Sequence, residues 1–119
     1  MAFVPTVCFD FDGVIHSYKS AWEGPDIIPD PPVPGMLKVF RELKEKGYII
    51  GVVSTRALNI SGKKAIEEYL KKYDFPFDFV TSEKVPCVVM IDDRAITFDG
   101  NCNTLVEKIT TFKPWNRKE

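Results

Sequence analysis

Three short apolar runs, spaced along the chain, constrain its fold more than any other feature. They span Thr6 to Phe11, Tyr48 to Ser54 and Cys87 to Ile91. Each run is apolar at nearly every position, which is typical of strands that are buried in a parallel sheet and covered by helices. The runs therefore predict three strands of one sheet.

The segments between and after these runs carry a helical pattern. Apolar residues recur at helical spacing in residues 34–46, 61–73 and 103–111. Residues 77–81 and 95–98 are weaker strand candidates. Alternating strands and helices imply right-handed crossovers. We therefore predict an α/β fold with a three-layer α/β/α, Rossmann-like parallel sheet.

A proline-rich loop interrupts this alternation. Residues 14–33 contain too many prolines for regular structure and follow directly after the first predicted strand. Ligands in open α/β sheets bind at the carboxyl ends of the strands, so we expect this loop to form a flap over the site. A chain of 119 residues suits a single domain, here residues 1–119.

The charge and cysteine content exclude several classes of function. The net charge is -1, which argues against bulk nucleic-acid binding and against adhesion to an anionic membrane. The sequence contains no apolar stretch of the roughly 20 residues that a membrane-spanning helix needs. Cys8 and Cys87 lie in apolar runs and are predicted to be buried thiols, which suits a reducing compartment. We therefore expect a cytoplasmic protein.

Pairs of acidic residues follow two of the predicted strands. Asp10 and Asp12 end the first apolar run, and Asp92 and Asp93 end the third. Carboxylates gathered at one edge of a sheet repel one another unless a cation compensates them. A plain acidic turn or part of a calcium loop is the alternative for the first pair, but the further oxygen ligands of a calcium loop do not follow. An all-oxygen site of this kind suits Mg²⁺.

Two hydroxyls and a lysine lie at the remaining strand boundaries. Ser54 and Thr55 end the second run, where hydroxyls and turn amides can hold phosphate oxygens or simply cap a turn. Lys84 precedes the third run in a loop, where it either binds an anion or is merely solvated. The order of acid pair, hydroxyl, lysine and acid pair is more specific than any of its parts.

The four elements together resemble the motifs of the haloacid dehalogenase-like superfamily, and the chain is similar to its phosphatases. The motifs are DFDGV (residues 10–14), VVST (residues 52–55), Lys84 and IDD (residues 91–93). The resemblance extends from about Thr6 to Asp99. It implies that family's fold without a cap domain, because neither interval between the motifs has room for one.

The resemblance also implies a role for each motif residue. Asp10 is expected to be the nucleophile that forms an aspartyl-phosphate, and Asp12 the general acid for the leaving group and then the base for water. Ser54, or equally Thr55, is expected to bind the transferring phosphoryl group, and Lys84 the phosphate. The expected Mg²⁺ ligands are Asp10, the backbone carbonyl of Asp12, Asp92 and, directly or through water, Asp93.

The function expected from these roles is Mg²⁺-dependent hydrolysis of phosphomonoesters. A site without a cap favours large phosphorylated substrates, or else a homo-oligomer in which a neighbouring subunit covers the site. The alternatives are a phosphotransferase, a phosphatase of small nucleotides or sugar phosphates, and a non-catalytic receiver-like domain. The receiver alternative is disfavoured because its acids and lysine come in a different order.

Several neighbouring residues have two interpretations each. His16 contacts the leaving group or packs within the loop. Tyr18 and Trp22 grip a base or sugar, or they are ordinary loop aromatics. Arg56 and Arg94 meet phosphate, or each pairs with an aspartate and holds the site in shape.

Overall fold

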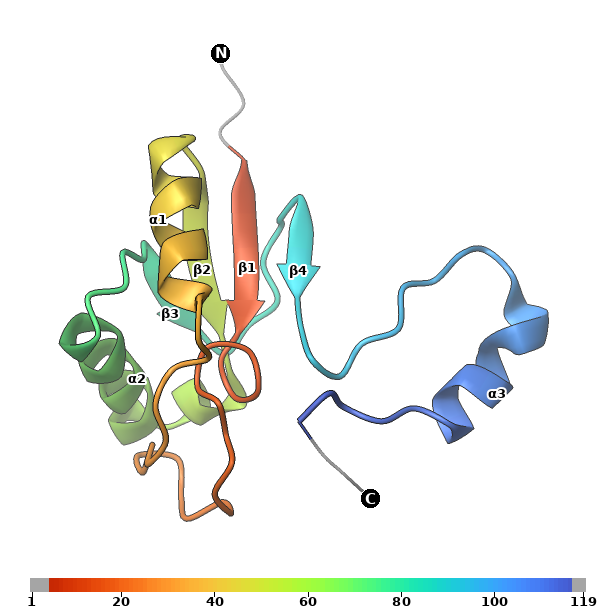
Figure 1. Cartoon of the computed structure of the whole chain (residues 1–119), viewed down its shortest axis with the longest axis horizontal. Coiled ribbons are helices and arrows are strands. Elements are labelled where there is room, and N and C mark those ends of the chain that lie inside the picture. Colours follow the sequence, from red (N-terminus) through yellow and green to blue (C-terminus); the bar gives the residue numbers. More distant parts are fainter. Residues whose placement is uncertain (1–4, 117–119) are drawn as a thin grey trace.

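A four-stranded parallel sheet organises the structure, a computed structural model that describes residues 5–116 (Figure 1). The strand order is β3-β2-β1-β4, and every neighbouring pair is parallel. The prediction of an α/β fold with a parallel sheet is therefore confirmed. The strands are β1 (Thr6–Asp10), β2 (Ile49–Val53), β3 (Phe79–Thr81) and β4 (Val89–Ile91).

One face of the sheet carries the hydrophobic core. Phe9 of β1 is paired with Val52 of β2, which is paired with Val80 of β3, so these side chains share a face. All three are buried in one cluster with side chains of two helices, α1 (Met36–Glu45) and α2 (Ile60–Lys72). The chain moves in one direction from β1 to β2 to β3, and right-handed crossovers then place both helices on this face.

The opposite face of the sheet is covered by no helix within residues 5–116. The return connection from β3 to β4 has to cross this face, but residues 82–88 form a loop that is too short for a helix. A hollow of about 290 Å³ remains there, lined by Cys8, Val53, Ser82, Lys84, Val85, Cys87 and Met90. The expected third layer is thus not seen in the described part of the chain.

The third helix lies away from the sheet instead. Helix α3 (Leu105–Thr110) follows the short 3-10 helix η2 (Cys102–Thr104), and none of its residues is buried. We call residues 95–114 the C-terminal arm, and Figure 1 shows it extending beyond β4 in blue. The radius of gyration, 15.3 Å, is larger than that of a compact chain of this length, about 13.5 Å.

Three sequence predictions in this region are wrong. The third apolar run was predicted to be a buried strand, but β4 is shorter and largely exposed. Cys87 was predicted to be buried and is exposed, whereas Cys8 is buried as predicted. Residues 95–98 form no strand. An apolar run indicates a strand, but it does not show whether another layer covers that strand.

The proline-rich loop is irregular, as predicted, but it is firmly attached to the core. The Ser17 hydroxyl donates to the carbonyl of Pro31 at 2.6 Å, and the backbone amide and hydroxyl of Ser20 both donate to Asp30 at 2.7 Å. Tyr69 of α2 donates its hydroxyl to the carbonyl of Asp30 at 2.9 Å. These bonds hold the base of the loop against α2.

Within residues 5–116, no helix is both long enough and apolar enough to cross a bilayer.

Candidate active site

The carboxyl ends of β1 and β4 bring three aspartates together. Phe9 of β1 is paired with Ile91 of β4, so the next residue of each strand reaches the same edge of the sheet. Carboxylate oxygens of Asp10, Asp92 and Asp93 lie within 4.8 Å of one another. These three acids were predicted to share a site, and the pairing of β1 with β4 explains how they meet.

Burial and, to a smaller extent, neighbouring negative charge disfavour the ionised form of the acids in this cluster. Burial raises the pKa of Asp10 to about 8, and the charges of Asp92 and Asp93 add to the increase. Burial likewise raises the pKa of Asp93. Without a compensating cation, Asp10 is therefore protonated over much of the neutral pH range.

Two further observations make the cluster a suitable site for a divalent cation. The Oδ1 atom of Asp93 is buried and has no hydrogen-bond partner among the described residues. Gly13, with φ at +83°, lies so close to the Asp93 carboxylate that a Cβ atom at position 13 would collide with it. An unpaired carboxylate oxygen, and a glycine that leaves room for the same carboxylate group, fit a hard cation with oxygen ligands such as Mg²⁺.

Asp12 belongs to a different network from the other three aspartates. Arg56 grips both of its carboxylate oxygens, with Nε–Oδ2 and Nη2–Oδ1 distances of 2.8 and 3.0 Å. His16 Nδ1 lies 2.8 Å from Asp12 Oδ1. Burial alone would raise the pKa of Asp12, but the hydrogen bonds from His16 and Arg56 outweigh it and lower the pKa. Asp12 is therefore held as a carboxylate.

Arg56 is the buried anchor of this network. Only 1% of its surface is exposed, and its Nη1 donates to the loop carbonyls of Gly24, Pro25 and Ile27 at 2.9, 3.0 and 3.1 Å. Of the two interpretations given for Arg56, pairing with an aspartate is the one that the structure supports. The sequence does not show that the same arginine also binds the proline-rich loop. The acceptors are backbone carbonyls, which every residue type carries.

His16 packs within the protein rather than facing the site. It is fully buried, its Nε2 accepts from the backbone amide of Asp30 at 3.1 Å, and its ring stacks on Phe11. With Nδ1 donating to Asp12, the imidazole orients that carboxylate. The packing interpretation of His16 is thus the correct one.

A cavity of about 430 Å³ opens beside the acids, within the range of small-molecule sites. It joins acids, hydroxyls, aromatic rings and one cation, namely Asp10, Asp12, Tyr18, Trp22, Ser54, Thr55, Asp93 and Arg94. The proline-rich loop thus contributes Tyr18 and Trp22 to the wall of this cavity, and its predicted role as a flap stays a prediction. Asp92 is close to the acids of this cavity but lines a shallower neighbouring hollow with Gly13 and Trp115.

The two hydroxyl residues occupy different positions in this cavity. Ser54 is buried, and its Oγ accepts from the backbone amide of Arg56 at 3.2 Å, which caps the short 3-10 helix η1 (Thr55–Leu58). Thr55 is exposed at the start of η1. Both remain candidates for a phosphate contact, since the Ser54 hydroxyl can still donate its proton.

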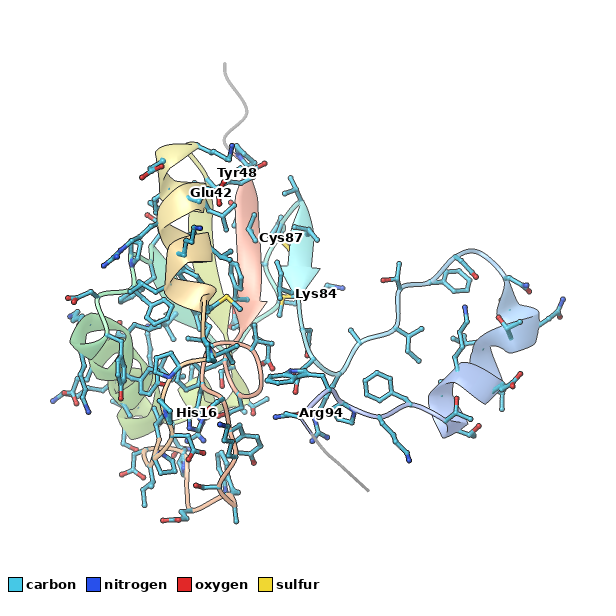
Figure 2. The ribbon with its side chains drawn as sticks, in the orientation of Figure 1. His16, Glu42, Tyr48, Lys84, Cys87 and Arg94 are labelled. Atoms are coloured by element: carbon cyan, nitrogen blue, oxygen red, sulfur yellow. The ribbon has the colours of Figure 1, made fainter. Side chains whose placement is uncertain are left out.

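Lys84 is not among the residues that line the acidic cavity. It lines the hollow on the open face of the sheet, together with Cys87 (Figure 2). Figure 2 shows Arg94 below the carboxyl end of β4, and this arginine lines the acidic cavity in place of the expected lysine. The loop of residues 82–88 is irregular, so its sequence does not indicate where the lysine side chain lies.

Trp115 closes one side of the acidic edge. Its indole Nε1 donates to the carbonyl of Gly13 at 2.7 Å. The nearby Asn116 donates its amide to the carbonyl of Ser17 at 3.4 Å. The two residues directly after the C-terminal arm therefore bring the chain back to the segment that follows β1.

Comparison with solved structures gives four matching chains, among them two that cover 95% and 88% of this chain. Both are chains from structures of the Pnkp1/Rnl/Hen1 complex, the second of which is described as an RNA repair complex. The first match has a TM-score of 0.53 and 19% identity, and covers 95% of this chain and 36% of the neighbour. The second has a TM-score of 0.52 and 19% identity, and covers 88% and 30%. No family model and no curated protein matches the chain.

These matches define an α/β fold related to chains of an RNA repair complex. At this level of identity they show the fold alone, and the chain spans about a third of each neighbour's length. They overturn the family that the sequence motifs suggested. The prediction of a haloacid dehalogenase-like phosphatase is wrong, because the likeness found is to the RNA repair chains and no family model supports the motifs. Short sets of acids, hydroxyl and lysine recur on unrelated folds, so they are a weak guide to family.

Proposed function

We propose that this protein is a Mg²⁺-dependent hydrolase of phosphomonoesters and that Asp10 is its nucleophile. One observation carries the proposal. Three carboxylates, of Asp10, Asp92 and Asp93, lie within 4.8 Å of one another at the end of two paired strands. A phosphate group can reach them through the adjoining cavity, which offers hydroxyls and Arg94.

The charge balance of the site explains why a cation is needed. Like charges 4 Å apart repel by about 4 kcal/mol at an effective dielectric constant of 20, so the bare cluster rejects a phosphate dianion. Asp10, Asp92 and Asp93 would hold Mg²⁺, with the turn at Asp12 and Gly13 beside it. When bound, the ion would neutralise the acids and polarise the phosphoryl oxygens.

The first chemical step belongs to Asp10. Its carboxylate oxygen attacks phosphorus, the bond from phosphorus to the ester oxygen breaks, and an aspartyl-phosphate forms. The departing oxygen takes up one proton. In the second step, water attacks phosphorus, loses a proton to a base, and releases inorganic phosphate and the free Asp10 carboxylate.

Asp12 suits the proton transfers because of how it is held. Its lowered pKa fits the second step, in which a carboxylate accepts the proton of the attacking water. The approach of a phosphate dianion would raise the pKa of Asp12 again, which allows it to carry a proton to the leaving group first. Arg56 and His16 keep the carboxylate oriented throughout.

The test of this function is phosphate release from a generic aryl phosphate with Mg²⁺. Asp10→Asn should abolish turnover while the far-UV circular dichroism stays unchanged. Asp99→Asn is the matched control, because Asp99 is an exposed aspartate of the C-terminal arm that pairs with Lys108. Excess chelator should silence the wild type, and added Mg²⁺ should restore it. Full turnover by the Asp10 variant, or activity in excess chelator, would contradict the proposal.

The nature of the neighbours bears on the size of the substrate. They are described as parts of a multi-protein complex, and one of them as part of an RNA repair complex. This agrees with a large phosphorylated substrate and with a partner protein beside the open site. An assay with added alcohol acceptors separates hydrolysis from phosphoryl transfer, the alternative reaction for the same residues.

A further inference from the structure

Trp22 lies at the wall of the acidic cavity with one face of its ring covered. The guanidinium carbon of Arg56 is 4.4 Å from the centre of the Trp22 ring. Arg56 is itself buried and bonded to Asp12 and to three loop carbonyls, so this guanidinium has little freedom to move. One face of the indole is therefore in contact with a planar cation that is itself held in place.

Trp22 remains partly accessible beside this contact. Trp22 is 52% exposed although it lines the cavity that holds Asp10 and Asp93. Since Arg56 covers one face, the exposed surface consists of the opposite face and the ring edges. Trp22 and the proposed phosphate site at Asp10 line the same cavity. An accessible tryptophan face in such a cavity can stack on a flat ring of the substrate.

A second aromatic residue of the same loop shares this cavity. Tyr18 has a φ of +54°, which is left-handed and costly for a residue with a side chain, and it lines the cavity with Trp22. Such strain persists only where the surrounding structure enforces it, and it is most frequent at binding and catalytic sites. The loop therefore holds two aromatic rings at the wall of the acidic cavity.

We propose that Trp22 is a stacking platform for a nucleobase, so that the substrate is a phosphomonoester of a nucleotide. This inference rests on the proposed phosphatase function and names its substrate class. The phosphate lies at Asp10, the sugar spans the cavity, and the base lies against Trp22. The same chemistry can come from a free nucleotide or from a single-stranded end that carries a terminal phosphate.

The experiment measures binding rather than turnover, by calorimetry with the Asp10→Asn protein and Mg²⁺. The matched probes are adenosine 5′-monophosphate and ribose 5-phosphate, which differ only in the base. We expect the nucleotide to bind about tenfold or more tightly than the sugar phosphate, the effect of one stacked base. Trp22→Leu should remove this difference, and Trp22→Phe should largely preserve it. Ile27→Ala is the control in the same loop, because the side chain of Ile27 is exposed and does not line the cavity.

Hexanucleotides that carry a phosphate at the 5′ or the 3′ end distinguish the two sources. If one hexanucleotide binds more tightly than adenosine 5′-monophosphate, the platform serves strand ends. If the mononucleotide binds as tightly as the hexanucleotides, the platform serves free nucleotides. Equal affinity for the nucleotide and the sugar phosphate, or a difference that survives Trp22→Leu, would overturn the inference. Activity on an aryl phosphate would be unaffected by that result, so failure of the platform and failure of the phosphatase function are distinguishable.

Discussion

At the scale of the residue, Arg56 links the chemistry of the site to the shape of its wall. A single guanidinium bonds to both oxygens of Asp12 and to three carbonyls of the proline-rich loop, and it supports the Trp22 ring. The planar, forked geometry of arginine matches these partners, and a lysine ammonium cannot reach all of them. One side chain therefore helps to hold both Asp12 and the loop in place.

Arg56→Lys should destabilise the protein although the charge is retained. We expect the free energy of unfolding to fall by about 3 kcal/mol, because several charge-assisted hydrogen bonds of a buried group are lost. Urea denaturation provides the measurement. Arg41→Lys, an exposed position on α1, should change stability by less than about 0.5 kcal/mol. Equal stability of the two variants would show that the Arg56 contacts contribute little.

Gly13 and Gly47 offer a matched pair for testing the acidic cluster. Both have a left-handed φ, +83° and +88°, but only Gly13 lies against the Asp93 carboxylate, and nothing lies within 4 Å of a Cβ at position 47. Substitution by alanine should cost about 1–2 kcal/mol of stability at position 47, and more at position 13, where the new Cβ also displaces the Asp93 side chain. Gly13→Ala should in addition weaken Mg²⁺ binding at least tenfold, as measured by calorimetry. Unchanged Mg²⁺ affinity in that variant would separate Asp93 from the cation site.

At the scale of the element, Asp78 joins the amino end of β2 to the last turn of α1. Its carboxylate accepts from the Ile50 backbone amide at 2.7 Å and from Lys44 Nζ at 2.8 Å. Burial alone would raise the pKa of Asp78, but the hydrogen bonds from Lys44 and Ile50 outweigh it and lower the pKa. The ionised carboxylate is therefore the form that stabilises this corner of the sheet.

Asp78→Asn should lower the free energy of unfolding at neutral pH by about 1 kcal/mol, the worth of a charge-assisted hydrogen bond near the surface. A lowered folded-state pKa stabilises above the ordinary pKa of about 4, and this stability is lost as the pH falls through the folded value. The difference between variant and wild type should thus shrink below pH ~4. Urea titrations from pH 3 to 7 measure it, with Glu68→Gln as an exposed control on α2. A difference independent of pH would contradict this account.

Sequence patterns correctly predicted the helices and strands that pack in the hydrophobic core. They were less accurate for the elements at the edge of the core. Helices α1 and α2 and strands β1, β2 and β3 follow from apolar periodicity, because burial selects it. Strand β4 carries the same signal, yet two of its three residues are exposed, since no helix of the described residues covers the adjacent face of the sheet. Lys84 was placed at the site by motif order, whereas the irregular loop directs it to the open face. The sequence allowed the ends of the strands to be aligned, but it did not allow the positions of loop side chains such as Lys84 to be predicted.

At the scale of the whole molecule, two long irregular segments differ in how they are held. The proline-rich loop is bonded to Arg56, Tyr69 and its own serines. The C-terminal arm is attached at its two ends, through β4 and through Trp115, and the residues of α3 between them are not buried. Local stability should follow these attachments rather than segment length.

Limited proteolysis should therefore cut the C-terminal arm before the proline-rich loop, although both lack regular structure over much of their length. Mass spectrometry of early fragments identifies the sites, and amide hydrogen exchange should show faster exchange in residues 95–104 than in β1 and β2. Arg56→Lys should make the loop newly sensitive without changing cleavage of the arm. Early cleavage within residues 14–33 of the wild type would refute this ranking.

The parallel pairing of β1 with β4 has a consequence for how the protein is made. Asp10 precedes β2, β3 and both core helices in the chain, and the acids that complete its cluster follow these elements. During translation the first strand can dock on β2 long before β4 leaves the ribosome. A nascent chain can thus fold over most of its core before the three aspartates of the acidic cluster come together.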